Sequence, residues 1–195
     1  IDALFLIAKT NPTFPLNNFN KEKIRMILVT VHRRENWGEK IANIAKGIKQ
    51  ILDKHSDCIV LLPMHKNQLV RDPLKKILGN NPRVFLTEPL RYDELVSSIQ
   101  NCTLLLTDSG GLQEEAPAFG KPVLILRETT ERPEALIAGT AKLVGTNSKI
   151  IFEEANLLLS HKEKYNKMAK SVNPFGDGKA SERIYGECMR FLKNE

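Results

Sequence analysis

A glycine-rich turn, Thr-Asp-Ser-Gly-Gly at residues 107–111, has the residue types and spacing best suited to chemistry in this sequence of 195 residues. An apolar run precedes it at 104–106, a short helical pattern follows at 112–119, and a second apolar run lies at 123–126. Because buried parallel strands are continuous apolar runs, this order predicts a strand, a turn, a helix and a second strand.

A helix that starts with Ser-Gly-Gly exposes backbone N–H groups with no Cβ atom in front of them, and the helix dipole adds positive potential there. The turn is therefore a candidate site for a phosphate or diphosphate. In the alternative interpretation, Ser109 only caps the helix, and Gly110 and Gly111 only allow a tight turn.

Glu115 lies one turn into the helix, where its carboxylate could accept hydrogen bonds from ribose hydroxyls. Alternatively, Glu114 and Glu115 only complement the helix dipole.

A cluster of basic side chains follows the apolar run at 24–31. It contains His32, Arg33 and Arg34. Arginine binds phosphate through two parallel hydrogen bonds, and histidine can donate a hydrogen bond or a proton near neutral pH. The cluster is therefore a second candidate for anion binding, and the alternative is a surface ion-pair cluster in which Glu35 neutralises one arginine.

Two further polar segments follow predicted strands. His65 comes shortly after the apolar run at 58–62, and Arg132 lies in the polar segment 127–134, which follows the run at 123–126. The segment at 127–134 is either a substrate-facing loop or a solvated turn, and His65 is either functional or simply structural or exposed.

The elements that must position these groups alternate between strands and helices. Apolar runs predict strands at 24–31, 58–62, 83–86, 104–106, 123–126 and 141–144. Helical spacing predicts helices at 2–9, 39–54, 67–78 with a kink or break near Pro73, 92–100, 112–119, 133–138, 149–159, 161–170 and 180–192. This alternation predicts an α/β fold with a parallel sheet and helices on both faces. Ligands of such folds bind outside the carboxyl ends of the strands, where the polar clusters lie.

Composition and motifs exclude several classes of protein. The net charge is +6, but the lysines are spread along predicted helices, so we expect no nucleic-acid partner. No apolar run approaches the roughly 18 residues of a membrane span, so we expect no membrane partner. Cys58, Cys102 and Cys188 are scattered and no zinc spacing occurs, so we expect no metal and a reducing, cytoplasmic setting. The start has neither a signal-peptide pattern nor an initiator Met, which suggests a fragment.

Three long motifs resemble those of the non-hydrolysing UDP-N-acetylglucosamine 2-epimerases. They are VTVHRRENWG at 29–38, LTDSGGLQEEAPAFGKPVLILRETTERPEAL at 106–136 and NPFGDGKASERI at 173–184. The resemblance implies two Rossmann-like domains in a glycosyltransferase-B-like fold, with the nucleotide sugar between them. It also implies interconversion of UDP-GlcNAc and UDP-ManNAc by elimination and re-addition of UDP, without any cofactor.

The resemblance also implies roles for the glycine turn and for the helix after it. Ser109, Gly110 and Gly111 would hold the diphosphate, and Glu115 would hold the ribose.

Roles elsewhere are implied in the same way. His32, as a catalytic residue, and Arg132 would lie at the phosphate and sugar side of the cleft, and the backbone near Leu95 would contact the uracil. Arg33 and His65 would contact a second, activating UDP-GlcNAc.

The resemblance divides the chain into a crossover helix and linker at 1–20, a UDP-binding Rossmann-like domain at 21–172 and a C-terminal helix at 173–195. That helix would return to a missing amino-terminal domain, which would contain the acidic catalytic residues. We therefore expect the chain alone to be inactive and the full-length protein to form a homodimer. Apolar side chains at both ends are expected to be exposed, dimerised or repacked: Leu4, Phe5, Ile184, Phe191 and Leu192.

Two other functions remain open from the sequence. One is the second half of a UDP-sugar glycosyltransferase, and the other is a non-catalytic module that binds nucleotide sugars.

Overall fold

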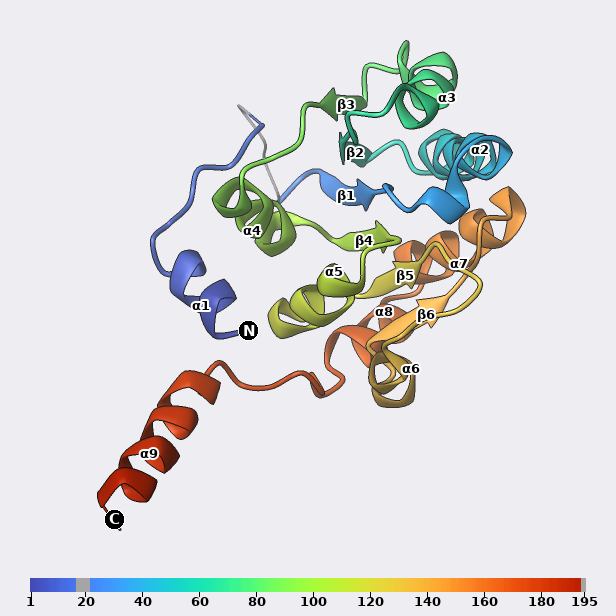
Figure 1. The fold of residues 1–195 in the computed structure, drawn as a ribbon. Coiled ribbons are helices and arrows are strands. Elements are labelled where there is room, and N and C mark those ends of the chain that lie inside the picture. Colours follow the sequence, from blue (N-terminus) through green and yellow to red (C-terminus); the bar gives the residue numbers. More distant parts are fainter. Residues whose placement is uncertain (17–21, 194–195) are drawn as a thin grey trace.

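A parallel sheet in the order β3-β2-β1-β4-β5-β6 forms the centre of the computed structural model, which describes residues 1–16 and 22–193 (Figure 1). The strands are β1 (Arg25–Thr30), β2 (Cys58–Pro63), β3 (Val84–Thr87), β4 (Leu104–Thr107), β5 (Val123–Ile125) and β6 (Ala141–Leu143). Every neighbouring pair is parallel. The strand order reverses between β1 and β4, and this is the place where doubly wound folds bind ligands.

Helices cover both faces of the sheet, which confirms the predicted Rossmann-like α/β fold (Figure 1). The helices of the described residues are α1 (Asp2–Ala8), α2 (Glu39–Lys54), α3 (Gln68–Leu78), α4 (Tyr92–Asn101), α5 (Gly110–Glu115), α6 (Pro133–Ala138), α7 (Ser148–Ser160), α8 (Lys162–Ala169) and α9 (Ala180–Lys193), with the short 3-10 helices η1 (Arg34–Asn36) and η2 (Ala116–Phe119). Buried side chains of α2, α3 and α7 pack on one face, and those of α4, α5 and α6 pack on the other.

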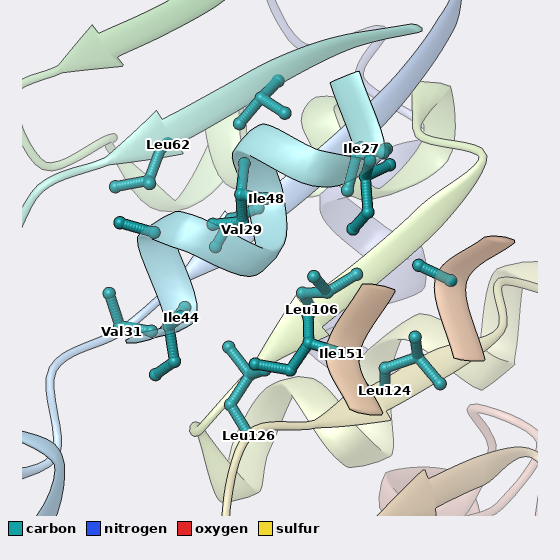
Figure 2. Close-up of a cluster of buried hydrophobic side chains, with 14 of the residues drawn as sticks. Ile27, Val29, Val31, Ile44, Ile48, Leu62, Leu106, Leu124, Leu126 and Ile151 are labelled. Carbon is teal, nitrogen blue, oxygen red and sulfur yellow. The ribbon is translucent and has the colours of Figure 1, made fainter. Parts of the chain in front are cut away.

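Strand β1 is buried on both sides because its successive side chains point to opposite faces of the sheet. Ile27 and Val29 belong to the cluster under α2 and α7, whereas Met26 and Leu28 belong to the cluster on the opposite face. Figure 2 shows the first cluster, in which Ile48 of α2 is drawn with Ile27 and Val29 of the sheet. This burial on both faces explains the continuous apolar run in the sequence. Strand β1 lies in the interior of the sheet, between β2 and β4.

Two predicted features of the helices need correction. Helix α3 runs through Pro73 without the predicted break, and Val70, Leu74 and Leu78 on both sides of the proline are buried in the core. The helix predicted at 112–119 begins earlier, at Gly110, and changes to a 3-10 helix at Ala116. Pro117 has no N–H to bond the carbonyl group four residues earlier, so one α-helical hydrogen bond is missing where the helix type changes.

The two ends of the chain differ from one another. Leu4 is buried within this chain, where α1 lies against α4, so of the expected states (exposed, dimerised or repacked) exposure is wrong for Leu4. Phe5 is partly buried and packs edge-on against Phe119, with 5.9 Å between ring centroids. Helix α9 extends away from the domain (Figure 1), and Ile184, Phe191 and Leu192 are 64%, 68% and 63% exposed, as predicted.

Parts of the predicted linker and of the chain end, residues 17–21 and 194–195, lie outside the described residues. Among the helices of the described residues, none is both long enough and apolar enough to cross a membrane.

Candidate functional site

The candidate site lies where β1 and β4 end side by side. Thr30 and Thr107 are in register across this strand pair, and their hydroxyl oxygens are 2.6 Å apart. The chain continues from Thr30 to His32 and from Thr107 into the glycine turn. Because both strands point the same way, these two predicted clusters meet at one edge of the sheet.

Asp108 joins the two clusters. Its side chain is fully buried, and it accepts hydrogen bonds from the backbone N–H groups of His32 and Arg33, at 3.0 and 2.9 Å, and from Nδ2 of Asn36 at 3.0 Å. Nδ1 of His32 lies 3.0 Å from the second carboxylate oxygen. Burial alone raises the pKa of Asp108, but the hydrogen bonds from His32 and Arg33 outweigh it, and the pKa lies below its ordinary value. Sequence reasoning missed this role, although Asp108 stands within the glycine-turn motif.

The glycine turn leaves its helix start open. Ser109 is the N-cap residue of α5, but its hydroxyl makes no capping hydrogen bond. A Cβ atom added at Gly111 would meet nothing within 4 Å, so this backbone faces open space. The first N–H groups of a helix have no partners within the helix. These features argue against the interpretation of the turn as a simple cap.

Two guanidinium groups flank the same turn. A Cβ atom at Gly110 would lie 3.7 Å from Nη2 of Arg33 and 4.0 Å from Nη2 of Arg132. Arg132 is also paired with Glu114. The Nε atom of Arg33 is buried without a hydrogen-bond partner. Backbone donors and two cations therefore surround one point, a combination that suits a group with more than one negative charge.

The alternative ion-pair cluster forms differently from the prediction. Glu35 pairs with the buried Arg127 at 2.6 Å rather than with an arginine of its own cluster. Arg127 also bonds Glu131 at 2.6 Å. Arg127 lowers the pKa of Glu131 to about 2, first by side-chain hydrogen bonding. Glu35 is therefore paired with an arginine outside its own cluster.

Two adjoining hollows open beside the turn. The first has a volume of about 320 Å³ and is lined by Thr30, His32, Tyr92, Leu95, Ser109, Gly111, Leu112 and Glu115. The second has a volume of about 180 Å³ and is lined by Thr30, Val31, His32, Pro63, Met64, His65, Pro89, Leu90 and Leu95. They share Thr30, His32 and Leu95, so together they form an elongated site along the strand ends.

Glu115 and Tyr92 form a hydrogen-bonded pair on the wall of the first hollow. The Tyr92 hydroxyl donates to Oε1 of Glu115 at 3.0 Å. Burial raises the pKa of Glu115, and burial together with the nearby carboxylate raises the pKa of Tyr92 to about 12. The pair presents a fixed carboxylate to the hollow.

The structure gathers all the predicted site residues at this edge. Those that line the first hollow are His32, Leu95, Ser109, Gly111 and Glu115. Gly110, Arg33 and Arg132 lie together at the turn, and His65 lines the second hollow. Arg33 therefore reaches the glycine turn itself, whereas it was predicted to act with His65 on a second ligand. Among the described residues, no group of three or more His, Cys, Asp or Glu could hold a metal ion.

A parallel sheet with strand order 3-2-1-4-5-6 and a glycine turn at its reversal point defines a Rossmann-type domain. The chain belongs to the UDP-N-acetylglucosamine 2-epimerase family, whose family model matches residues 1–188. The family resemblance of the sequence motifs is thereby confirmed.

Individual relatives agree with this assignment. The UDP-N-acetylglucosamine 2-epimerase of Bacillus subtilis (strain 168) is 45% identical over 190 residues, which cover 97% of this chain and 50% of the relative. A protein of S. aureus in a co-structure with UDP is 42% identical with a TM-score of 0.91, covering 99% of this chain and 53% of that chain. UDP-GlcNAc 2-epimerase from Neisseria meningitidis, bound to UDP-GlcNAc, is 40% identical with a TM-score of 0.89, covering 97% and 53%. The chain thus spans about half the length of the relatives it matches.

Proposed function

We propose that this chain is the UDP-binding half of an enzyme that interconverts UDP-GlcNAc and UDP-ManNAc. The observation that carries the proposal is the meeting of the glycine turn, His32 and two arginines at the reversal point of the sheet. The ligands bound to the similar structures from S. aureus and Neisseria meningitidis, UDP and UDP-GlcNAc, support it.

The nucleotide diphosphate would bind at the glycine turn. The N–H groups at Gly110 and Gly111 would donate to phosphate oxygens, and Arg33 and Arg132 would neutralise their charge. The Glu115 carboxylate, fixed by Tyr92, would accept hydrogen bonds from the ribose diol. The uracil would then lie beside Leu95, which borders both hollows.

In the reaction, the C2–H and C1–O bonds of the sugar break, and the products are 2-acetamidoglucal and UDP. Negative charge grows on the diphosphate oxygen as the C1–O bond breaks, and His32, Arg33 and Arg132 would stabilise it. UDP then adds back to C1, and a proton returns to C2 on the opposite face. The carboxylates that transfer the C2 proton would belong to the other half of the protein.

The ends of the chain suit a connection to that other half. The exposed apolar side chains of α9, among them Ile184 and Phe191, would pack on the amino-terminal domain. The crossover at 1–20 and the helix segment at 173–195 would then join the two domains, and the full-length protein would form a homodimer.

Calorimetric titration of this chain tests the proposal. UDP and UDP-GlcNAc should bind, inorganic diphosphate should bind more weakly, and ADP more weakly than UDP, because the base position beside Leu95 is proposed to hold uracil. Incubation of the chain with UDP-GlcNAc should form no UDP-ManNAc, as read by proton NMR. Absence of UDP binding, or equal binding of ADP and UDP, would contradict the assignment of the site.

A further inference from the structure

Asp108 is a buried acid whose side-chain partners all belong to the segment after β1. Its relative exposure is 0%, and among the described residues the hydrogen-bond partners of its carboxylate are His32, Arg33 and Asn36. One further contact comes from a titratable side chain: Nδ1 of His32 lies 3.0 Å from Oδ1 of Asp108. Asn36 is itself buried and also donates to the carbonyl of Leu126 at 3.0 Å. The loop after β1 and the short helix η1 therefore hold this carboxylate in one orientation.

The contact with His32 determines which ring nitrogen carries a proton. An ionised carboxylate has no hydrogen to donate, so Nδ1 must be the donor in this bond. In neutral His32 the second nitrogen, Nε2, is then unprotonated, and in the imidazolium form it becomes a donor. His32 lines both hollows, and its side chain is 41% exposed. Nε2 is thus the nitrogen that is left for a ligand.

We infer that Asp108 is a positioning residue, which keeps a proton on Nδ1 of His32 and turns Nε2 toward the diphosphate. The direction of Nε2 toward a diphosphate rests on the proposed function, whereas the proton on Nδ1 does not. A cationic His32 held in this way donates to the phosphate oxygen on which charge grows when the C1–O bond breaks. The same carboxylate holds the backbone N–H of Arg33, so it also sets where the guanidinium enters the turn.

The first test reads the proton directly. Long-range nitrogen–proton NMR correlations of the ¹⁵N-labelled chain, recorded on the neutral ring of His32, distinguish its two neutral forms. We expect the proton on Nδ1 of His32 in the unliganded chain. A proton on Nε2 would overturn the inference, and this measurement needs neither a variant nor UDP binding.

The second test separates positioning from simple structural support. UDP affinity is measured by calorimetry for the chain and for the variants D108N, H32Q and D108N/H32Q. If Asp108 acts through His32, D108N should weaken UDP binding about tenfold when His32 is present, and only about twofold in the H32Q background. Equal losses in both backgrounds would mean that Asp108 does not act through His32, and would overturn the inference.

Control measurements distinguish a failure of the inference from loss of folding and from absence of UDP binding. Asp57, an acid paired with Arg25 near the start of β1, can be changed to Asn without touching the site, so D57N should bind UDP normally. Thermal unfolding reports whether D108N is folded, and if it is not, the NMR measurement on the unmodified chain still decides the question. If the unmodified chain does not bind UDP, the proposed function fails while the position of the His32 proton is still measured.

Discussion

Replacement of Gly111 separates folding from ligand binding in this chain. Gly111 lies in the first turn of α5, and a Cβ atom there meets nothing within 4 Å. Alanine therefore fits without strain. Because alanine has the better helix propensity by up to about 1 kcal/mol, G111A should unfold at the same temperature as the unmodified chain or slightly higher.

G111A should weaken ligand binding, although it leaves the stability of the fold unchanged or slightly higher. The new methyl group would stand in the hollow that Gly111 lines, directly in front of the helix start. Each hydrogen bond from this backbone to a charged phosphate contributes about 1.5–3 kcal/mol, and a loss of 1.4 kcal/mol is a factor of ten. Loss of one such bond predicts UDP binding that is roughly 10- to 150-fold weaker. G111D should weaken it further, since it adds a negative charge, although an acid in the first turn stabilises a helix by about 0.3–1 kcal/mol.

Calorimetry with UDP and thermal unfolding of the same samples measure both effects. Gly186 in α9 is the matched control, because a Cβ atom there also meets nothing within 4 Å and the position is far from the turn. G186A should keep the UDP affinity unchanged. If G111A bound UDP as tightly as the unmodified chain, the diphosphate would not lie at the start of α5, and the reasoning about the open turn would be refuted.

Three further predictions concern the core, the ribose contact and acid stability. Ile48 is 1% exposed within the core, so I48A should lower the free energy of unfolding by about 2–5 kcal/mol in urea denaturation, and a loss below 1 kcal/mol would disagree with this packing. Y92F frees the carboxylate of Glu115. It should therefore weaken binding of UDP several-fold but that of 2′-deoxy-UDP less, and equal losses in calorimetry would argue against a ribose contact. Glu131 has a pKa lowered to about 2 by Arg127, so its contribution to stability is present above its ordinary pKa of 4.5 and is lost as the pH falls toward 2. E131Q should make urea midpoints less dependent on pH across that range, and an unchanged dependence would contradict the ion pair.

Much of the fold was predictable because its signals are local. Helix α2 has the predicted bounds, since apolar residues recur along it at helical spacing and the residues on its buried side are all in the core. The strands are short apolar runs, and the glycine turn lies between two of them, so its position at a strand end followed from the pattern. The course of α3 through Pro73 did not follow from local signals, because packing on both sides of the proline outweighed its lost hydrogen bond.

The burial of Leu4 shows a second limit of the sequence. The resemblance suggested that both ends of the chain face another domain, but α1 lies against α4 and buries Leu4 within this chain. Which surface an amphipathic segment covers depends on what the tertiary structure places next to it. Helix α9 is held at its start by hydrogen bonds from Ala180 and Ser181 to Asp2 of α1, and Ile184 further along it stays exposed.

Some features of the candidate site also followed from the sequence, and others only from the tertiary structure. Residue types alone identified the Ser-Gly-Gly helix start and the basic cluster after β1, because anion binding by exposed N–H groups and arginines is a local property. Only the tertiary structure decided which charges meet. Glu35 pairs with Arg127 across 92 residues of sequence, and Arg33 is thereby left at the turn. Asp108 likewise joins His32 across 76 residues, because β1 and β4 are neighbours in the sheet and far apart in the chain.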